Sequence, residues 1–203
     1  MKKISILAII LYLVFTYNLK AADHTILNIK DDDFVLGESD APVTIIAYES
    51  MSCSHCADFH NLTLKELKTE YIDTGKVKFV FRDFPFNYPA LAGSMLMRCI
   101  SNENRYDYMN GLYKLQKKWV FRDNKKTLSE LYKIMQSGGM QKEDFDTCLS
   151  DINLENDLLE GVMNAQKEFN IRSTPSFIIN GQLYSGNKNI KEFRQIIDKI
   201  LSQ

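Results

Sequence analysis

The sequence has no excess of charge of either sign. Its 203 residues include 25 Lys and Arg side chains against 26 Asp and Glu side chains, which gives a formal net charge of −1. A nucleic-acid-binding face usually shows as a basic excess or a basic run, and this composition has neither. We therefore expect no nucleic-acid partner and no strongly polarised surface.

Internal repeats, low-complexity segments and linker-like stretches are also missing from the chain. Hydrophobic residues make up 45% and charged residues 25% of the sequence, which are ordinary values for a globular protein. A chain of 203 residues can form one domain with a full core, or one domain that carries a sizeable insertion.

Cysteine is scarce, and the spacing of the four cysteines excludes several kinds of site. Cys53 and Cys56 form a CxxC pair, but a structural zinc site needs a second close pair of ligands, and Cys99 and Cys148 lie far apart. Haem attachment needs CxxCH, whereas Ala57 follows the pair. A purely structural CxxC bridge closes a very small ring and adds little stability. The motif therefore favours redox chemistry, and no metal, nucleotide or flavin site is visible.

The CxxC pair lies where a predicted strand ends and a predicted helix begins. Residues 42–48 form a short, β-branched run, which is typical of a buried strand. From Cys53 to about Thr74, apolar residues recur in every turn, with no Gly or Pro until Gly75, which predicts a helix. Cys53 should fall at or just before its first turn, where unpaired N–H groups and the helix dipole favour a negative charge.

This position predicts a reactive outer thiol and a buried inner one. A CxxC cysteine at a helix N-terminus can have its pKa lowered to ~3.5–7.5, so Cys53 should be largely ionised at neutral pH. Cys56, one turn further along, should be less exposed and should resolve the mixed disulfides that Cys53 forms. His55 adds a second donor to the thiolate. The Ser54-His55 dipeptide thus favours a pair that donates disulfides.

Residues 1–22 have the layout of a secretory signal peptide. Lys2 and Lys3 precede an apolar run from Ile4 to about Tyr17, and the small pair Ala21-Ala22 follows. The alternative is an uncleaved membrane anchor, because Leu19 or Lys20 stands where a cleavage site wants a small residue. The run is short for a membrane span of about 20 residues, which favours cleavage.

Four cysteines form an even set for an exported chain. If Cys53 pairs with Cys56, then Cys99 is left to pair with Cys148, and such a bridge would persist in an oxidising compartment. Two buried free thiols are the alternative reading. Both cysteines fall on core-facing positions of predicted helices.

The remaining pattern is strand, long helical block, and strand again. A second strand is expected at residues 77–81, and helices almost throughout residues 89–169, including one helix across 109–119 and one with a Thr127/Glu130 capping box. Asn180-Gly181 predicts a type I′ hairpin, before a final amphipathic helix. Near the N-terminus, two edge pieces should flank Asp31-Asp32-Asp33, which we interpret as a solvated turn rather than a cation site, and Arg82-Asp83 as a surface pair.

Taken together, these motifs resemble the DsbA-like thiol:disulfide oxidoreductases of the thioredoxin-fold superfamily. The resemblance covers roughly residue 34 to the C-terminus. It is carried by residues 36–43, Cys53-Ser54-His55-Cys56, Arg82-Asp83-Phe84-Pro85 and Thr174-Pro175. It implies an α/β thioredoxin fold whose first part (23–86) carries the CxxC, with an inserted helical domain (87–168) and a second part (169–203). It also implies that Pro175 follows a cis peptide bond and packs against the CxxC.

Two departures from the family pattern concern the site. Many members keep a buried acid six positions before the first active-site cysteine, where Ala47 stands here. Glu49 lies two residues further on and on the same side of the strand, so it could take over proton transfer or could be exposed. The other departure is Ser54, which replaces the proline that many members have before the histidine.

The sequence therefore predicts an exported enzyme that introduces disulfide bonds into secreted or periplasmic proteins by exchange at Cys53-Cys56. A disulfide isomerase or reductase is one alternative, and a non-enzymatic envelope binding or chaperone module is another. The expected partners are unfolded or newly exported cysteine-containing proteins and a DsbB-like membrane protein that reoxidises the pair. We expect a monomer in the periplasm or cell envelope, with no bound cofactor.

Overall fold

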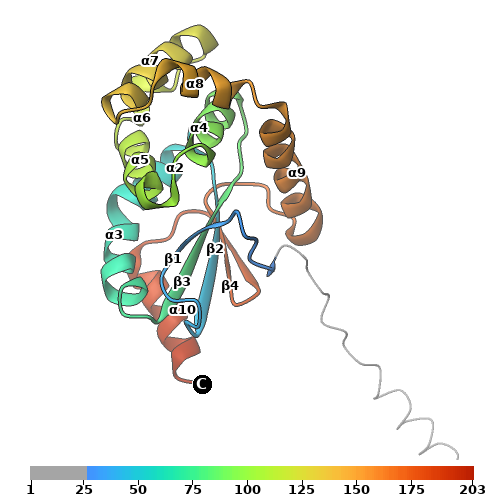
Figure 1. Ribbon diagram of the computed structural model, residues 1–203. Helices are drawn as coiled ribbons and strands as arrows, with labels where there is room; N and C mark the ends of the chain where they lie inside the picture. The colour runs from blue at the N-terminus through green and yellow to red at the C-terminus, as the bar shows by residue number, and fades with distance from the viewer. Residues whose placement is uncertain (1–26) are drawn as a thin grey trace, which may run out of the picture.

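The computed structural model describes residues 27–203 (Figure 1). The signal peptide predicted for residues 1–22 lies outside the described residues. Within 27–203, no helix combines the length and the apolar character that crossing a membrane requires.

One mixed five-stranded sheet forms the centre of the fold, in the order β1-β3-β2-β4-β5. The strands expected at residues 42–48 and 77–81 are confirmed as β2 and β3, which are parallel. β1 pairs antiparallel with β3, and β4 pairs antiparallel with β2. The strands are β1 (Phe34–Leu36), β2 (Val43–Glu49), β3 (Val77–Asp83), β4 (Ser176–Ile179) and β5 (Gln182–Ser185).

Both faces of the sheet are covered, so its central strands are apolar throughout. In β2, Ile45 packs in a core cluster with Phe59 and Phe193 from the helices on one face. The next residue, Ile46, packs with Ala165 in a second cluster on the other face. Because successive side chains of a strand point to opposite faces of the sheet, the hydrophobic run of β2 contributes to both cores.

The helix that follows β2 runs over residues 54–72, with Cys53 as its N-cap in an extended conformation (φ −80°, ψ 122°). The prediction of a helix from Cys53 to about Thr74 is thus confirmed to within two residues. It alternates between α and π turns: α2 (Ser54–Asp58), η2 (Phe59–Thr63), α3 (Leu64–Leu67) and η3 (Lys68–Ile72). A π turn shifts the phase of the helix, and Leu62, which lies within η2, is 67% exposed.

A block of helices separates β3 from β4 and gathers at one end of the sheet, from which α9 runs back alongside it (Figure 1). The single helix expected across residues 109–119 is wrong, because the chain breaks at Leu115 into two helices. The helices are α4 (Tyr88–Arg98), α5 (Asn102–Lys114), α6 (Gln116–Trp119), α7 (Asn124–Ser137), α8 (Lys142–Leu149) and α9 (Ile152–Phe169).

The capping box predicted at Thr127 and Glu130 is also wrong. Asp123 caps α7, since its side chain accepts hydrogen bonds from the N–H groups of Lys125 and Lys126. Thr127 is instead fully buried, and its hydroxyl bonds the backbone of Phe121.

The interpretation of Asp31-Asp32-Asp33 as a solvated turn is wrong for Asp33. The predicted surface pair of Arg82 with Asp83 is also wrong. Asp33 is buried and accepts two hydrogen bonds from Arg82, at 3.0 and 2.6 Å. Asp83 pairs instead with Arg98, at 2.9 Å. Only one of the two edge pieces expected here is a strand, because Arg82 also binds the Asn28 carbonyl and holds that segment outside the sheet.

The last part of the chain agrees with its predicted pattern. Asn180 and Gly181 have φ values of 43° and 85°, as the predicted type I′ turn between β4 and β5 requires. The final helix, α10 (Ile190–Leu201), begins with a capping box between Asn189 and Glu192.

Candidate active site

The two cysteines of the CxxC pair lie at the point where β2 ends and α2 begins. Both are free thiols in this structure; Cys53 is partly exposed and Cys56 is fully buried. The N–H of Cys53 donates to the Ser50 carbonyl at 3.0 Å, and the Cys53 carbonyl accepts from Ala57 at 3.1 Å. These bonds fix Cys53 at the tip of the helix, as the sequence predicts.

Thr174 lies next to Cys53, although 121 positions separate the two residues in the chain. The antiparallel pairing of β2 with β4, which sets Tyr48 opposite Ser176, carries this loop to the end of β2. The Cys53 Sγ lies 3.3 Å from the Thr174 carbonyl oxygen. The Thr174–Pro175 peptide bond is cis, in agreement with the expectation from the resemblance.

The surroundings of the two thiols shift their pKa values in opposite directions. A hydrogen bond from the Cys56 thiol is the main cause that lowers the pKa of Cys53 to about 5, against the opposing effect of partial burial. Thr174 and the backbone N–H groups of Cys56 and His55 lower it further. Burial is the main cause that raises the pKa of Cys56 far above its usual range, and the charges of Glu49 and Cys53 add to it. The outer sulfur is therefore a thiolate at neutral pH and the inner one a thiol.

Ser54 and His55 occupy the first turn of α2, and both side chains are exposed. The His55 contribution to the lowered pKa of Cys53 comes through its backbone N–H. Within the described residues, the His55 ring makes no hydrogen bond to the sulfur, which differs from the predicted role of the ring as a second donor.

Glu49 is buried, which decides between the two alternatives that the sequence left open. Its Oε2 lies 2.6 Å from Nε2 of His60, which is also buried, and 3.4 Å from the Tyr113 hydroxyl. The other ring nitrogen of His60, Nδ1, lies 3.2 Å from Asn110 Oδ1. Because an amide oxygen can only accept, Nδ1 carries a proton, and one further proton is shared between Nε2 and Oε2.

The second carboxylate oxygen of Glu49 has no hydrogen-bond partner in the described part of the chain. Glu49 Oε1 is buried and accepts no hydrogen bond from any residue in 27–203. Its charge acts on the buried Cys56 thiol, as the raised pKa of that thiol shows. Glu49 is thus a buried carboxylate with free accepting capacity in the electrostatic neighbourhood of the inner sulfur.

Helices of the inserted block hold the loop that leads into the CxxC pair. Gln116 Nε2 donates to the carbonyls of Met51 and Cys53, at 3.0 and 2.9 Å. Ser52 donates its hydroxyl to Asn87 Oδ1 at 3.0 Å, next to the N-terminus of α4. The insertion therefore supports the redox site as well as covering one end of the sheet.

Cys99 and Cys148 form a disulfide, which is the first of the two alternatives weighed from the sequence. It joins the C-terminal end of α4 to α8 inside the helical block. Cys148 contacts the Met95 carbonyl, and within the described residues neither sulfur of the bridge contacts Cys53 or Cys56, so it is not part of the CxxC site.

Sequence reasoning missed His60, Asn110, Tyr113 and Gln116. A signal for His60 was available, because it lies four residues after Cys56 and therefore on the same face of the helix. The other three come from the helical block, and only the tertiary fold brings them to the site. No group of three or more His, Cys, Asp or Glu side chains in residues 27–203 is arranged to hold a metal ion.

Comparisons with known proteins agree with this geometry. The family model described as Thioredoxin matches residues 30–199. A relative from Rickettsia conorii, provisionally named a protein-disulfide oxidoreductase, is 32% identical over 181 residues, which cover 86% of this chain and 62% of the relative. Disulfide bond formation protein D of Bacillus subtilis is 25% identical over 82% of this chain and 76% of its own length.

Among solved structures, α-DsbA1 of Wolbachia pipientis superposes with a TM-score of 0.82 at 27% identity, over 88% of this chain and 96% of that one. The match therefore extends over nearly the whole of that structure, whereas it covers less than two thirds of the length of the Rickettsia relative. Because the family model covers most of the chain and the DsbA structures share its helical insertion, the protein belongs to the thioredoxin family and to its DsbA-like members.

Proposed function

We propose that this protein is an exported thiol:disulfide oxidoreductase that donates its Cys53–Cys56 disulfide to cysteine-containing proteins. The observation that carries the proposal is the contrast between the two thiols, with the pKa of Cys53 lowered to about 5 and that of Cys56 raised. A stabilised thiolate stabilises the reduced pair and makes Cys53 a good leaving group. Both effects favour handing a disulfide to a substrate.

The reaction proceeds in two exchanges. A substrate thiolate attacks Cys53 of the oxidised pair, a mixed disulfide forms, and Cys56 leaves as a thiolate that takes up a proton. A second substrate thiolate then attacks the substrate sulfur of the mixed disulfide and releases Cys53 as a thiolate. The substrate loses two electrons and gains a disulfide, and the Cys53–Cys56 pair gains those two electrons.

Glu49 and His60 supply the proton that Cys56 takes up when it leaves. The raised pKa of Cys56 means that a bare thiolate there is unstable, so its departure needs a nearby acid, and its return as a nucleophile needs a nearby base. The proton shared between Glu49 and His60 can serve in both directions. Thr174 and Pro175 place the substrate chain beside Cys53, and Ser54 and His55 form the exposed first turn that it meets.

Location and partners follow from the same function. Residues 1–22 direct export to the periplasm or cell envelope, where substrates are newly exported proteins with unpaired cysteines. A DsbB-like membrane protein accepts the electrons and returns the pair to its disulfide form. The protein acts on these partners as a monomer.

Trapping the mixed disulfide tests the proposal. The oxidised chain is mixed at pH 7 with a reduced synthetic peptide that contains two cysteines, and its oxidation is followed by mass spectrometry. We expect one peptide disulfide per enzyme pair. Reduced Cys56→Ala enzyme, mixed with a single-cysteine peptide held as a mixed disulfide with thionitrobenzoate, should release thionitrobenzoate and retain the peptide on Cys53, because neither an inner thiol nor a second peptide thiol resolves the adduct. Cys53→Ala should give neither this adduct nor oxidation of the two-cysteine peptide.

An unreacted peptide, or an adduct that forms equally in Cys53→Ala, would overturn the assignment of Cys53. Insulin reduction and the refolding of a scrambled substrate distinguish the direction of the reaction. Faster insulin reduction than peptide oxidation would favour the reductase, and rapid rescue of the scrambled substrate would favour the isomerase.

A further inference from the structure

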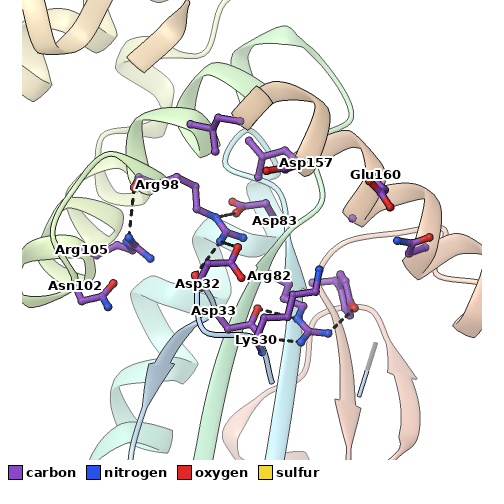
Figure 2. A pocket seen from close by; sticks show the side chains of 15 residues that line it. Lys30, Asp32, Asp33, Arg82, Asp83, Arg98, Asn102, Arg105, Asp157 and Glu160 are labelled. Atoms are coloured by element: carbon purple, nitrogen blue, oxygen red, sulfur yellow. Dashed lines mark hydrogen bonds and ion pairs between the residues drawn. The ribbon is translucent and has the colours of Figure 1, made fainter. Parts of the chain in front are cut away.

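A cavity of about 600 Å³ lies away from the two cysteines, between α5 and α9 and beside the ends of β2 and β3 (Figure 2). Its volume is in the range of small-molecule sites, ~300–1,000 Å³. None of Cys53, Cys56, Thr174 or Pro175 lines it. We call it the α5–α9 cavity; it is lined by Lys30, Asp32, Asp33, Tyr48, Arg82, Asp83, Arg98, Asn102, Arg105, Leu154, Asp157, Leu158, Glu160, Gly161 and Asn164.

Some charges of the cavity are matched by partners within the protein. Arg82 is paired with Asp33, at 2.6 Å. Arg98 is paired with Asp83 at 2.9 Å and with Asp32 at 3.1 Å. Figure 2 shows these pairs side by side on one wall. These ion pairs form one wall of the cavity, and the other charged side chains of the lining remain free to bind a ligand.

Arg105, on the α5 wall, is the first of these remaining charges. Its Nε and Nη2 donate to the carbonyls of Ile100 and Arg98, and its guanidinium lies 5.5 Å from the centre of the Phe34 ring. Within residues 27–203 it has no ion pair with a carboxylate, and its Nη1 donates no hydrogen bond. Because Nε and Nη2 already donate to backbone carbonyls, Nη1 is the group that remains to donate a charge-assisted hydrogen bond to a carboxylate.

Asp157 and Glu160 carry unmatched charges of the opposite sign on the α9 wall. They are three residues apart, hence on one helix face, and neither forms an ion pair with a described cation. Lys30, which also lines the cavity, forms no ion pair with a described carboxylate. Leu154 and Leu158 lie on the same helix and line the cavity, so they give it an apolar strip beside the two acids.

Gly161 keeps the α9 wall open. It lies inside α9, where a glycine is less favourable than alanine by about 1 kcal/mol, and a Cβ added there would meet nothing within 4 Å. Packing among the described residues therefore does not require a glycine at this position. A side chain there would instead narrow the cavity that Gly161 lines.

We propose that the α5–α9 cavity binds a short peptide with free termini. The peptide carboxylate bonds Arg105, and its ammonium group lies between Asp157 and Glu160. An apolar first side chain packs on Leu154 and Leu158. A zwitterion of this kind matches unpaired charges of both signs, whereas a simple anion or cation would match only one wall.

Calorimetric titration of the full chain with leucyl-glycyl-glycine tests this site. The tripeptide has no cysteine, so its binding does not depend on thiol exchange and is independent of the proposed redox function. We expect saturable binding that weakens at least tenfold in Arg105→Gln and at least tenfold when the peptide is N-acetylated or its carboxylate is amidated. Gly161→Leu should abolish binding.

Gly111→Leu is the matched control, because Gly111 is also a glycine inside a helix with nothing within 4 Å of an added Cβ, but does not line the cavity. It should bind like the wild type. Absence of binding to the wild type, or equal binding by Gly161→Leu, would overturn the site. If the N-acetylated or the amidated peptide bound as tightly as the unblocked tripeptide, the zwitterion assignment would be overturned. If Gly161→Leu fails to fold, Arg105→Gln and the blocked peptides decide the result.

Discussion

At the scale of single residues, two thiols three positions apart have opposite surroundings. Cys53 is partly exposed at a helix tip, where the Cys56 thiol and two backbone N–H groups stabilise its anion. Cys56 is buried near the Glu49 carboxylate, so its anion is destabilised. The chain thus separates the reactive sulfur from the resolving one by burial rather than by residue type.

The lowered pKa of Cys53 should make the stability of the reduced protein depend on pH. Unfolded cysteine titrates near ~8.5, whereas folded Cys53 titrates at about 5. The folded state binds fewer protons in this window, so the contribution is complete above the unfolded pKa and is lost as the pH falls toward 5. Cys56 is neutral in both states below pH 8.

Urea unfolding of the reduced and oxidised forms between pH 8 and pH 5 measures this effect. The oxidised form is the control, since its Cys53–Cys56 pair has no thiol to titrate. We expect the reduced form to lose stability relative to the oxidised form as the pH falls. A constant difference between the two forms across this window would contradict the lowered pKa.

Substituting Glu49 by Gln should slow the step in which Cys56 attacks the mixed disulfide. Glutamine keeps the shape of the side chain but cannot take the proton of Cys56, and general-base catalysis typically contributes ~10²–10⁴-fold. We expect a slowing of about 100-fold at pH 7, with partial recovery as the pH rises. Stopped-flow measurement of adduct resolution gives the rate.

Tyr113→Phe is the control for Glu49→Gln, because it removes a 3.4 Å contact to the carboxylate but leaves the carboxylate itself. Tyr113→Phe should slow the resolution of the mixed disulfide by Cys56 much less than Glu49→Gln does. If Glu49→Gln resolved the adduct at the wild-type rate, solvent and not Glu49 would carry the proton of Cys56.

At the scale of secondary-structure elements, local signals were sufficient where the cause is local. The Asn180-Gly181 turn and the position of Cys53 at a helix start depend on neighbouring residues, and both predictions are confirmed. No glycine or proline marks the break at Leu115 or the π turns after Cys56, so the local pattern does not predict them. Thr127 was misread because a buried threonine and a capping threonine share the same local pattern.

The contact between α6 and the CxxC loop predicts a structural role for Gln116. Its amide donates to the Met51 and Cys53 carbonyls, and Gln116→Leu leaves the buried Met51 carbonyl without this donor. We expect a loss of about 1–3 kcal/mol in the free energy of unfolding. Urea denaturation of the oxidised protein measures it.

Gln136→Leu is the matched control on α7, because among the described residues the Gln136 side-chain amide bonds only the exposed Tyr132 hydroxyl. Its effect on the free energy of unfolding should be close to zero. Equal losses in the two variants would mean that Gln116 does not hold the loop.

At the scale of the whole molecule, three distant parts of the chain form one site. β2 supplies the carboxylate and leads into the thiols, the loop before β4 supplies Thr174-Pro175, and the helical block supplies Tyr113 and Gln116. The Cys99–Cys148 disulfide closes a loop across 49 positions of that block. By loop entropy it should stabilise the folded protein by roughly 4 kcal/mol.

Long-range partners are what the sequence could not predict. The thioredoxin fold, the CxxC pair and Thr174-Pro175 could be predicted because each has a signature within a few residues. The pairing of Arg82 with Asp33 spans 49 positions, and both residues had closer partners of opposite charge in the sequence. Only the β1–β3 pairing shows which of the acids is buried.

The redox potential of the Cys53–Cys56 pair tests the central claim most directly. Equilibrating the purified protein with defined ratios of reduced and oxidised glutathione at pH 7 gives this potential. Because a stabilised Cys53 thiolate favours the reduced form, the account predicts a value clearly more oxidising than the roughly −270 mV of thioredoxin. A value as reducing as that of thioredoxin would contradict it.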